Sequence, residues 1–486
     1  MTAAAAMMGP ALAGAGASSV AQATAPEMGN DPYRSTTALI EALVTKKNSS
    51  AELVDAAINR IEAIDPRINA VVARDFDRAR DAARQADASP RSDRRPLQGI
   101  PITVKEAYNV VGLPTTWGMP EYQNWHPASD AVAVARLKAA GAISLGKTNV
   151  PLGLMDWQSY NEVYGTTNNP WDTKLTPGGS SGGSAAALAS GYVSMELGSD
   201  LAGSLRCPAH FCGICSHKPS FGLVPLGGHA PPPIEGYGPE IPMSVGGPMA
   251  RSVGDIERAM DILTAAESGQ ARSSYMQLAP PRHQTLNEFR VLVVDAHPLG
   301  PTASEIRDAL GRIAQELGKR GTKVVHASPL LPDLAEATRI YHVLFGWLPD
   351  SSGVSKLVTR YISPEWIAAT LARRRLVAQW QAFFREWDLV LCPVMSNLAF
   401  PHDHSDRDIR KIDIDGAAFP YSLNFAWPSL ASVADLPATV VPIGQSRAGL
   451  PIGLQIIGPY FEDRTTIAFA GLLEREFGGF IKPPRF

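Results

Sequence analysis

The sequence has little cysteine for its length and no strong excess of either charge. Four cysteines in 486 residues are too few for a disulfide framework. A formal net charge of -3 offers no basic surface to nucleic acid, and the arginine-rich residues 84–97 are interrupted by aspartates and prolines, as in a solvated loop. No apolar run reaches the roughly 18 residues that a membrane-spanning helix needs. We therefore predict a globular protein that partners neither nucleic acid nor a membrane.

Three of the four cysteines lie close together in the sequence. Cys207, Cys212 and Cys215, with His210 and His217 nearby, resemble a partial set of metal ligands. No second pair of ligands follows them, and a free cysteine behaves as a small apolar residue. The sequence therefore predicts reduced, structural thiols, with no metal and no cofactor.

The first 30 residues are small, apolar and rich in alanine. They include Ala21-Gln22-Ala23, which resembles a signal-peptidase site, but no lysine or arginine precedes Arg34. The positively charged start of an export signal is thus missing. Two interpretations stay open, an incomplete export signal and a disordered tail. We favour the tail, predict a cytoplasmic location, and place the folded domain at residues 31–486.

Helical and strand patterns alternate along the rest of the chain. Ser49 and Glu52 have the spacing of a capping box, and the apolar periodicity after them predicts a helix that ends before Pro66. A buried strand is predicted to end near Lys105, a helix over residues 130–140, and a strand–helix–strand unit between residues 289 and 328. Linkers and internal repeats are lacking. The pattern favours one large α/β domain.

Residues 175–191, LTPGGSSGGSAAALASG, raise the question of which serine reacts. Gly178 to Gly182 fit the G-x-S-x-G elbow of α/β-hydrolases, but that elbow needs a preceding strand, and the residues before it read as loop. Ten histidines are present, and none has a distinctive setting as a partner. A phosphate-binding loop would need a closing G-K-[ST], which is absent. Neither pattern is favoured here.

A wider combination of motifs is more specific. GIPITVKE at 99–106, TPGGSSGGSAAALASG at 176–191 and GSDLAGSLRCPAHFCG at 198–213 occur in this order. Together they resemble the amidase signature family, and the resemblance spans most of residues 31–486. It implies a single large domain with a mixed β-sheet covered by helices on both faces, and a hydrolase that cleaves carboxylic amide C–N bonds. It also implies Ser204 as nucleophile, Ser180 as a serine preceded by a cis peptide bond, and Lys105 as base.

The chemistry of these three residues agrees with the implied triad. A lysine acts as a base only when it is neutral, and apolar surroundings such as those of Lys105 favour the neutral form. Each serine hydroxyl can both donate and accept, so Ser180 could pass a proton from Ser204 to the amine and back to the leaving group. For Ser181 two roles stay open, a supporting hydrogen bond near the triad or the N-cap of the following helix.

The turn before Ser204 is the implied oxyanion hole. The resemblance assigns this role to the backbone N–H groups of Leu201, Ala202 and Gly203. The family has a glycine where this chain has Ala202, and alanine would be strained if that position required a positive φ. Asp200 and Arg206 flank the turn, and we expect them to hold it by ion pairing.

The resemblance also places Leu154, Met155 and Trp157 in the acyl pocket. Their apolar bulk favours an aryl or alkyl amide, although the same residues could be ordinary core. A carbamate or ester hydrolase with the same triad stays open, as does the glutaminase subunit of a tRNA-dependent amidotransferase, which would need a partner chain. A non-catalytic binding protein is less expected because all three triad residues are present. The oligomeric state is left open, a homodimer being one option.

Overall fold

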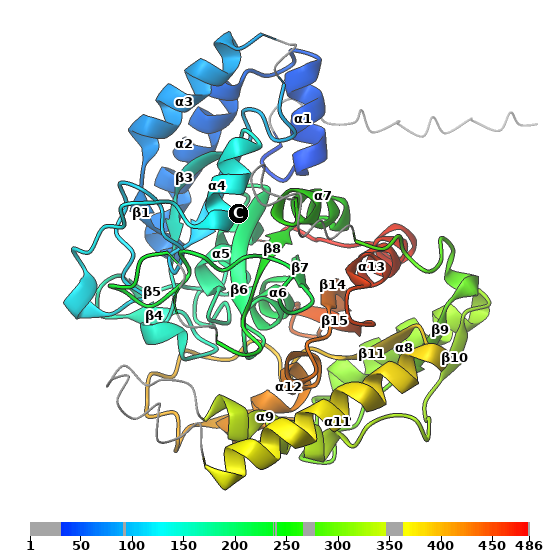
Figure 1. Ribbon diagram of the computed structural model, residues 1–486. Helices are drawn as coiled ribbons and strands as arrows, with labels where there is room; N and C mark the ends of the chain where they lie inside the picture. Colours follow the sequence, from blue (N-terminus) through cyan, green and yellow to red (C-terminus); the bar gives the residue numbers. More distant parts are fainter. Residues whose placement is uncertain are drawn as a thin grey trace, which may run out of the picture. The chain divides into compact units, whose positions relative to one another are not determined.

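An eleven-stranded mixed sheet runs through the part of the chain that the structure describes (Figure 1). The computed structural model describes residues 31–90, 94–236, 238, 241–265, 278–346 and 363–484. The strands, in sheet order, are β1 (Val71–Arg74), β3 (Ile143–Thr148), β2 (Pro101–Lys105), β6 (Met195–Asp200), β8 (Val245–Ala250), β7 (Cys215–Lys218), β14 (Ala438–Gln445), β15 (Pro451–Ile457), β11 (Leu389–Pro393), β9 (Arg290–Val293) and β10 (Lys323–Val325). The predicted tail at residues 1–30 lies outside the described residues and stays a prediction.

Strand direction changes along the sheet, and β1 at one edge runs antiparallel to β3. Strand β2 runs parallel to β3 and β6, and β9 runs parallel to β10 and β11. The strands between β6 and β11 pair antiparallel. Two short hairpins lie outside the sheet, β4 (Tyr160–Asn161) with β5 (Gly165–Thr166), and β12 (Lys411–Ile414) with β13 (Ala417–Pro420).

Helices cover both faces of the sheet, as the resemblance implied, so the predicted fold class is confirmed. They are α1 (Thr36–Val44), α2 (Ser50–Ile68), α3 (Phe76–Ala88), α4 (Val132–Ala139), α5 (Gly182–Ala189), α6 (Arg206–Cys212), α7 (Val253–Leu263), α8 (Ser304–Lys319), α9 (Leu334–Phe345), α11 (Pro364–Glu386), α12 (Ala426–Val433) and α13 (Asp463–Phe477). None of these helices in the described ranges is long and apolar enough to cross a bilayer.

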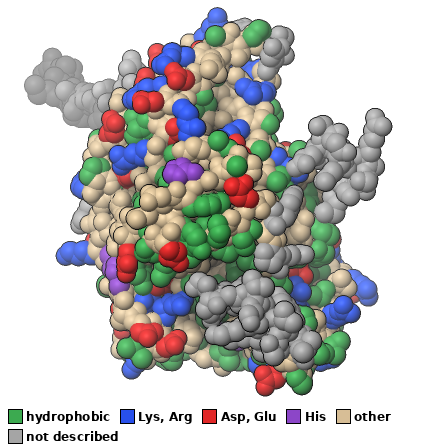
Figure 2. Space-filling view, turned by 60° about the vertical axis from the view of Figure 1, so that its left-hand side comes forward, with side chains coloured by type: hydrophobic (Ala, Val, Ile, Leu, Met, Phe, Trp, Pro, Cys, Tyr) green, Lys and Arg blue, Asp and Glu red, His purple; other side chains and the backbone are tan. Residues whose placement is uncertain are grey.

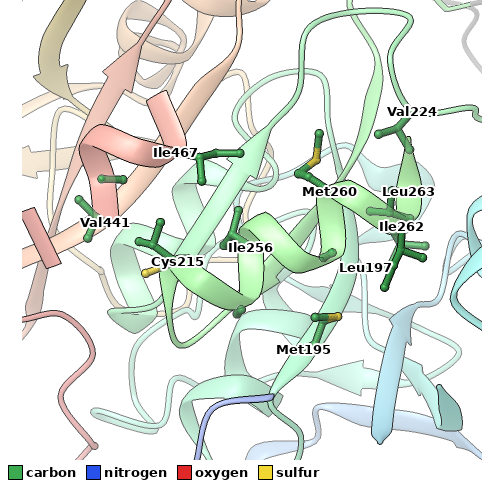
Figure 3. Close-up of a cluster of buried hydrophobic side chains, with 14 of the residues drawn as sticks. Met195, Leu197, Cys215, Val224, Ile256, Met260, Ile262, Leu263, Val441 and Ile467 are labelled. Carbon is green, nitrogen blue, oxygen red and sulfur yellow. The ribbon is translucent and has the colours of Figure 1, made fainter. Parts of the chain in front are cut away.

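Adjacent residues of a strand pack their side chains into different parts of the core. Val440 packs in the cluster that contains α5 and α6, whereas its neighbour Val441 packs with α7 and α13. This is the alternation expected of a sheet that is buried on both faces. Figure 3 shows the second cluster, where Ile256 of α7 and Ile467 of α13 lie near Cys215 of β7. On the surface, basic and acidic side chains are mixed on the face drawn in Figure 2.

Several expected elements occur, with shifted ends. Ser49 and Glu52 form the predicted capping box of α2, and β9, α8 and β10 form the predicted strand–helix–strand unit. The prediction that α2 stops before Pro66 is wrong. The helix continues to Ile68 and ends at Asn69, which has a left-handed φ of 58°. Pro66 lies in the last turn, where it lacks the N–H that would bond to the carbonyl of Glu62, and the burial of Ile64 and Ile68 offsets this loss.

Candidate active site

Lys105 is the last residue of β2, and its side chain is fully buried. Its Nζ donates hydrogen bonds to Ser180 Oγ at 2.7 Å and to Ser199 Oγ at 2.9 Å. Ser180 comes from the loop before α5, and Ser199 from β6, which pairs with β2. The sheet and the start of α5 thus bring a buried amine and two hydroxyls together.

The surroundings of Lys105 favour a neutral amine. Burial lowers the pKa of Lys105 to about 7, although the negative charges of Asp200 and Glu196 act in the opposite direction. The neighbouring carboxylate of Glu106 is occupied elsewhere, because it accepts the backbone N–H groups of Thr116 at 2.6 Å and Trp117 at 2.9 Å. Near neutral pH, a large share of Lys105 can therefore hold a lone pair that accepts a proton.

The loop before α5 presents Ser180 to this amine. The peptide bond between Gly179 and Ser180 is cis. A Cβ added at Gly179 would lie 2.5 Å from the carbonyl oxygen of Asp156, so the close approach of these two segments requires glycine. The loop can reach Lys105 only with such a small residue at this position.

Ser181 occupies the N-cap position of α5 but makes no capping hydrogen bond with its side chain. Its Oγ donates instead to the carbonyl of Ser199 at 3.3 Å and accepts the N–H of Ser199 at 3.4 Å. The geometry therefore favours the supporting role over the capping role. Ser181 fastens the loop to the strand that carries the second partner of Lys105.

Ser204 lies on the turn that follows β6, and only 8% of its surface is exposed. Its carbonyl accepts the N–H of Ser181 at 3.3 Å, which joins the turn to the Ser180–Ser181 loop. Ser204 also lines a cavity of about 250 Å³. The structure thus places Ser204 beside the loop that holds Ser180, at the edge of a space that can hold a ligand.

Asp200 holds the turn that carries Ser204. Its carboxylate accepts the N–H groups of Gly203 at 2.9 Å and Leu205 at 3.1 Å, and it pairs with Arg206 at 2.8 and 3.0 Å. Both side chains of the ion pair are fully buried. Burial alone would raise the pKa of Asp200, but the charge and hydrogen bonds of Arg206 outweigh it and hold the pKa at about 2. Asp200 therefore remains an anion that fixes the backbone of the turn.

The backbone of the turn bears on which N–H groups can form the predicted oxyanion hole. The positive φ falls on Gly203, at 91°, and Ala202 is not among the residues with positive φ, so the alanine meets no strain there. The N–H of Gly203 already donates to Asp200. Gly203 was predicted to donate its N–H to the substrate oxygen. In the structure this N–H points at the carboxylate of Asp200 instead. Leu201 and Ala202 both line the cavity.

The three predicted pocket residues meet at this cavity. Leu154, Met155 and Trp157 all line it, and Met155 is the most exposed of them, at 39%. Trp157 donates its indole N–H to the carbonyl of Ala202 at 2.8 Å, so one wall of the cavity is bonded directly to the turn before Ser204. The rest of the lining is Asp156, Leu201, Ala202, Ser204, Phe345, Arg407, Asp408, Tyr421, Ser422 and Phe425.

The cysteines and histidines that resembled a ligand set are used in the core. Cys207, Cys212 and Cys215 are buried free thiols. His210 Nδ1 accepts the N–H of Gly453 at 2.7 Å, and His217 lies between Thr439 and Asp463 at 2.9 and 3.0 Å. Within the described ranges, no group of three or more histidine, cysteine or acidic residues has the arrangement of a metal site.

Comparison with known proteins identifies the family. A family model for amidases matches residues 52–346 and 351–467 of the chain. The chain belongs to the amidase family. The resemblance inferred from the three motifs is therefore confirmed, and so is the prediction that the chain is an enzyme of the amidase class.

Relatives of this amidase-family chain match it over nearly their whole lengths. A glutamyl-tRNA(Gln) amidotransferase subunit from Anaeromyxobacter sp. (strain K) is 30% identical over 491 residues, covering 91% of this chain and 96% of that protein. The fatty-acid amide hydrolase 2-A of Danio rerio is 30% identical over 484 residues, covering 90% and 87%. A crystal structure of an amidase superposes with a TM-score of 0.74 at 27% identity, covering 92% of this chain and 100% of the other.

The sequence did not predict some residues of the amidase-family site. Ser199 is the second partner of Lys105, and its only signal was a place one residue before Asp200 in the motif GSDLAGS. Phe345, Tyr421 and Phe425 line the cavity, and the last two contact the ring of Trp157. They lie far from the motifs in sequence, and no local pattern marks them.

Proposed function

We propose that the chain hydrolyses carboxylic amides with an aryl or alkyl acyl group, through an acyl-enzyme on Ser204. The observation that carries the proposal is the hydrogen bond of 2.7 Å between buried Lys105 Nζ and Ser180 Oγ, in a loop bonded to the backbone of Ser204. A buried base, a relay hydroxyl and a serine beside a cavity are the parts that nucleophilic acyl transfer needs.

Proton transfer along the two serines would activate the nucleophile. Neutral Lys105 accepts the proton of the Ser180 hydroxyl, and Ser180 takes the proton of Ser204 as its Oγ attacks the carbonyl carbon. The same chain returns the proton to the leaving nitrogen, so the amine departs uncharged. Water then attacks the acyl-enzyme by the same route and releases the carboxylic acid.

Backbone donors near Ser204 would stabilise the negative charge on the substrate oxygen. We assign this role to the N–H groups of Leu201 and Ala202, with Gly203 directed to Asp200 instead. Each such donor is worth roughly 3 to 4 kcal/mol in the transition state. The Asp200–Arg206 ion pair would contribute by keeping these donors in place before the substrate arrives.

The lining of the cavity supports an uncharged, apolar acyl group. Aromatic and aliphatic side chains dominate it, and the carboxylate of Asp156 is paired with Arg410 at 2.8 Å. Arg407 and Asp408 carry opposite charges. A charged acyl group would lose its hydration against this mostly apolar lining, a cost that an uncharged apolar group avoids.

A second function is favoured by the relatives at 30% identity. One of them is a subunit of a glutamyl-tRNA(Gln) amidotransferase, so the same site could release ammonia from glutamine in a complex with partner chains. Carbamates and esters stay open for the same triad, because the acyl-transfer step is shared.

Parallel assays of the purified single chain test the proposal. We expect an aryl anilide to be hydrolysed fastest, an aliphatic amide or aryl carbamate more slowly, and glutamine not at all, with Ser204→Ala as the background control. Faster hydrolysis of the aryl carbamate than of the matched anilide would favour the carbamate alternative. Turnover of glutamine alone, or only after an amidotransferase partner is added, would contradict the proposal.

A further inference from the structure

A buried ion pair of Asp156 with Arg410 adjoins the aromatic wall of the cavity, which consists of Trp157, Tyr421 and Phe425, and Asp156 itself belongs to the cavity lining. Arg410 NH1 is 2.8 Å from Asp156 Oδ2, and the two side chains are 0% and 4% exposed. Tyr421 Oη donates to Asp156 Oδ1 at 2.6 Å, and Tyr160 Oη donates to Asp156 Oδ2 at 3.3 Å. Both oxygens of this carboxylate are therefore bonded, and one of the donors belongs to the wall.

The ion pair joins two segments that are distant in sequence. Asp156 lies between Met155 and Trp157 on one side of the cavity, and Arg410 belongs to the loop that precedes β12. A further contact crosses between the same segments, because Arg407 donates to the carbonyl of Met155. The loop before β12 is thus fastened to the segment that carries Trp157.

Arg410 also contacts the wall itself. Its guanidinium carbon lies 4.7 Å from the centre of the Tyr421 ring, a cation–π contact. Tyr421 begins the 3₁₀ turn η5 (Tyr421–Phe425), and Phe425 ends it. The Trp157 ring meets both of these aromatic rings edge to face, at 5.3 Å from Tyr421 and 4.6 Å from Phe425. The positions of all three rings therefore depend on where Asp156 and Arg410 hold η5.

We propose that the Asp156–Arg410 ion pair sets the size of the acyl group that the enzyme accepts. The pair fixes Tyr421 and Phe425 in contact with Trp157, and these three rings form one wall of the cavity of about 250 Å³. The inference rests on the proposed function, since it places the acyl group in the cavity beside Ser204. Asp156 and Arg410 are positioning residues here, because they act on the substrate through the aromatic rings.

The physical argument is one of complementarity. Aromatic rings attract each other at edge-to-face or offset angles, so a flat aryl group gains from walls that are held still. An acetyl group has fewer atoms to place against these rings, so it gains less from their position. Loosening the ion pair should therefore weaken the binding of a benzoyl substrate more than that of an acetyl substrate.

Asp156→Asn tests this inference with two 4-nitroanilides that differ only in the acyl group, acetyl and benzoyl. Asparagine keeps the shape of the side chain and removes the charge that pairs with Arg410. We expect the ratio of kcat/KM for benzoyl over acetyl to fall by roughly ten-fold, the scale of a lost apolar contact. The loss should appear as a higher KM for the benzoyl substrate at an unchanged kcat.

Asp388→Asn is the matched control. Asp388 is a buried carboxylate just before β11, paired with Arg282 at 3.2 Å and Arg290 at 2.9 Å, and it does not line the cavity. Its substitution should lower the thermal midpoint and leave the benzoyl-to-acetyl ratio unchanged. An equal change of the ratio in both variants would mean general destabilisation and would overturn the proposal.

Tyr421→Phe decides the question if Asp156→Asn does not fold. It removes one donor to Asp156 and keeps the ring, so the ratio should fall in the same direction by a smaller factor. An unchanged ratio in the variants that fold, while Ser204 still becomes acylated, would overturn this inference alone. Failure of the proposed function would look different, because the wild-type chain would then form no acyl-enzyme on Ser204 with either anilide.

Discussion

Different forces stabilise two regions of the molecule, the surroundings of Lys105 and the aromatic wall of the cavity. Lys105, Ser180, Ser181 and Ser199 are joined by hydrogen bonds between elements packed on one sheet. The wall is held by edge-to-face ring contacts and by the ion pair that adjoins it. In the first region each side chain has a specific hydrogen-bonding partner. In the second, packing between rings dominates, beside the hydrogen bonds of Trp157 to Ala202 and of Tyr421 to Asp156.

The difference separates reaction chemistry from substrate choice. Removing a group near Lys105 breaks a hydrogen-bonded chain, and the remaining members then lack a partner in a buried site. Changing a ring in the wall alters the volume and shape of the cavity. We therefore expect substitutions in the first region to lower kcat for every substrate, and substitutions in the second to change the ranking of substrates.

The largest effect is expected at Ser204. Ser204→Ala should lower kcat by about 10⁴-fold or more, because removing a nucleophile costs as much as removing the whole catalytic unit. Circular dichroism should be unchanged. Ser181→Ala is the matched control, since Ser181 Oγ bonds only the backbone of Ser199 among the described contacts, and its loss should be far smaller. Equal losses of kcat in the two variants would contradict the assignment of Ser204 as the nucleophile.

The next effect concerns the proton on Lys105. Because burial lowers its pKa to about 7, the neutral amine predominates above that pH and is lost below it. We expect kcat/KM to fall about ten-fold for each pH unit below pH 7. Lys105→Ala should lose roughly 10² to 10⁴-fold and show no acid limb near pH 7. A wild-type profile that is flat from pH 8 to pH 5 would show that the amine is not the base.

A smaller effect, on stability, is expected at Asp200. Asp200→Asn leaves Arg206 buried without its counter-charge, which costs about 3 to 5 kcal/mol. The wild-type pair also has a defined pH dependence. The pKa of Asp200 is lowered to about 2 from an ordinary value near 3.9, so its contribution is complete above about pH 4 and is lost as the pH falls toward 2. Thermal melts between pH 2 and pH 6 measure both effects.

Asp77→Asn is the control for that experiment. Asp77 is fully exposed, at 3.6 Å from Arg80, and exposed pairs of this kind contribute little. Its melting temperature should equal that of the wild type at every pH. If Asp200→Asn behaved like Asp77→Asn, the buried ion pair would have no part in holding the turn.

The smallest effects are expected at the Trp157 side of the cavity. Trp157→Phe keeps a ring but leaves the carbonyl of Ala202 without its donor, which should cost about 1 kcal/mol and lower kcat/KM roughly five-fold for the benzoyl anilide and less for the acetyl anilide. Met155→Ala, at a half-exposed position, should change kcat/KM by less than about two-fold, since exposed apolar groups contribute little. A larger loss of kcat/KM in Met155→Ala than in Trp157→Phe would contradict the assignment of Trp157 to the wall of the cavity.

The two regions also differ in how far the sequence predicts them. Lys105 and Ser204 lie where a strand pattern ends, so the local pattern predicts their positions in the fold, whereas their roles came from the resemblance to the amidase signature family. The aromatic wall depends on contacts such as that of Tyr421 with Asp156, across 265 positions, for which a single sequence carries no periodic signal. The hydrogen bond of Ser199 with Lys105 was missed for a related reason, because it depends on the pairing of β2 with β6.

Local rules also failed where packing overrides them. The helix α2 runs through Pro66, because its buried apolar face extends to Ile68. The sequence pattern marked Ala202 as the residue at risk of strain, but the turn places its positive φ on Gly203. Both outcomes depend on neighbours from other segments, such as Pro428, which lies against Gly203.

Covalent labelling tests the central claim most directly. Wild-type protein is treated with a fluorophosphonate at pH 8, digested, and mapped by mass spectrometry, with Lys105→Ala treated in parallel. The account predicts a single adduct on Ser204, formed much more slowly when Lys105 is absent. An adduct on Ser180 or Ser181, or equal labelling rates in the two proteins, would contradict a nucleophile at Ser204 that depends on the buried amine.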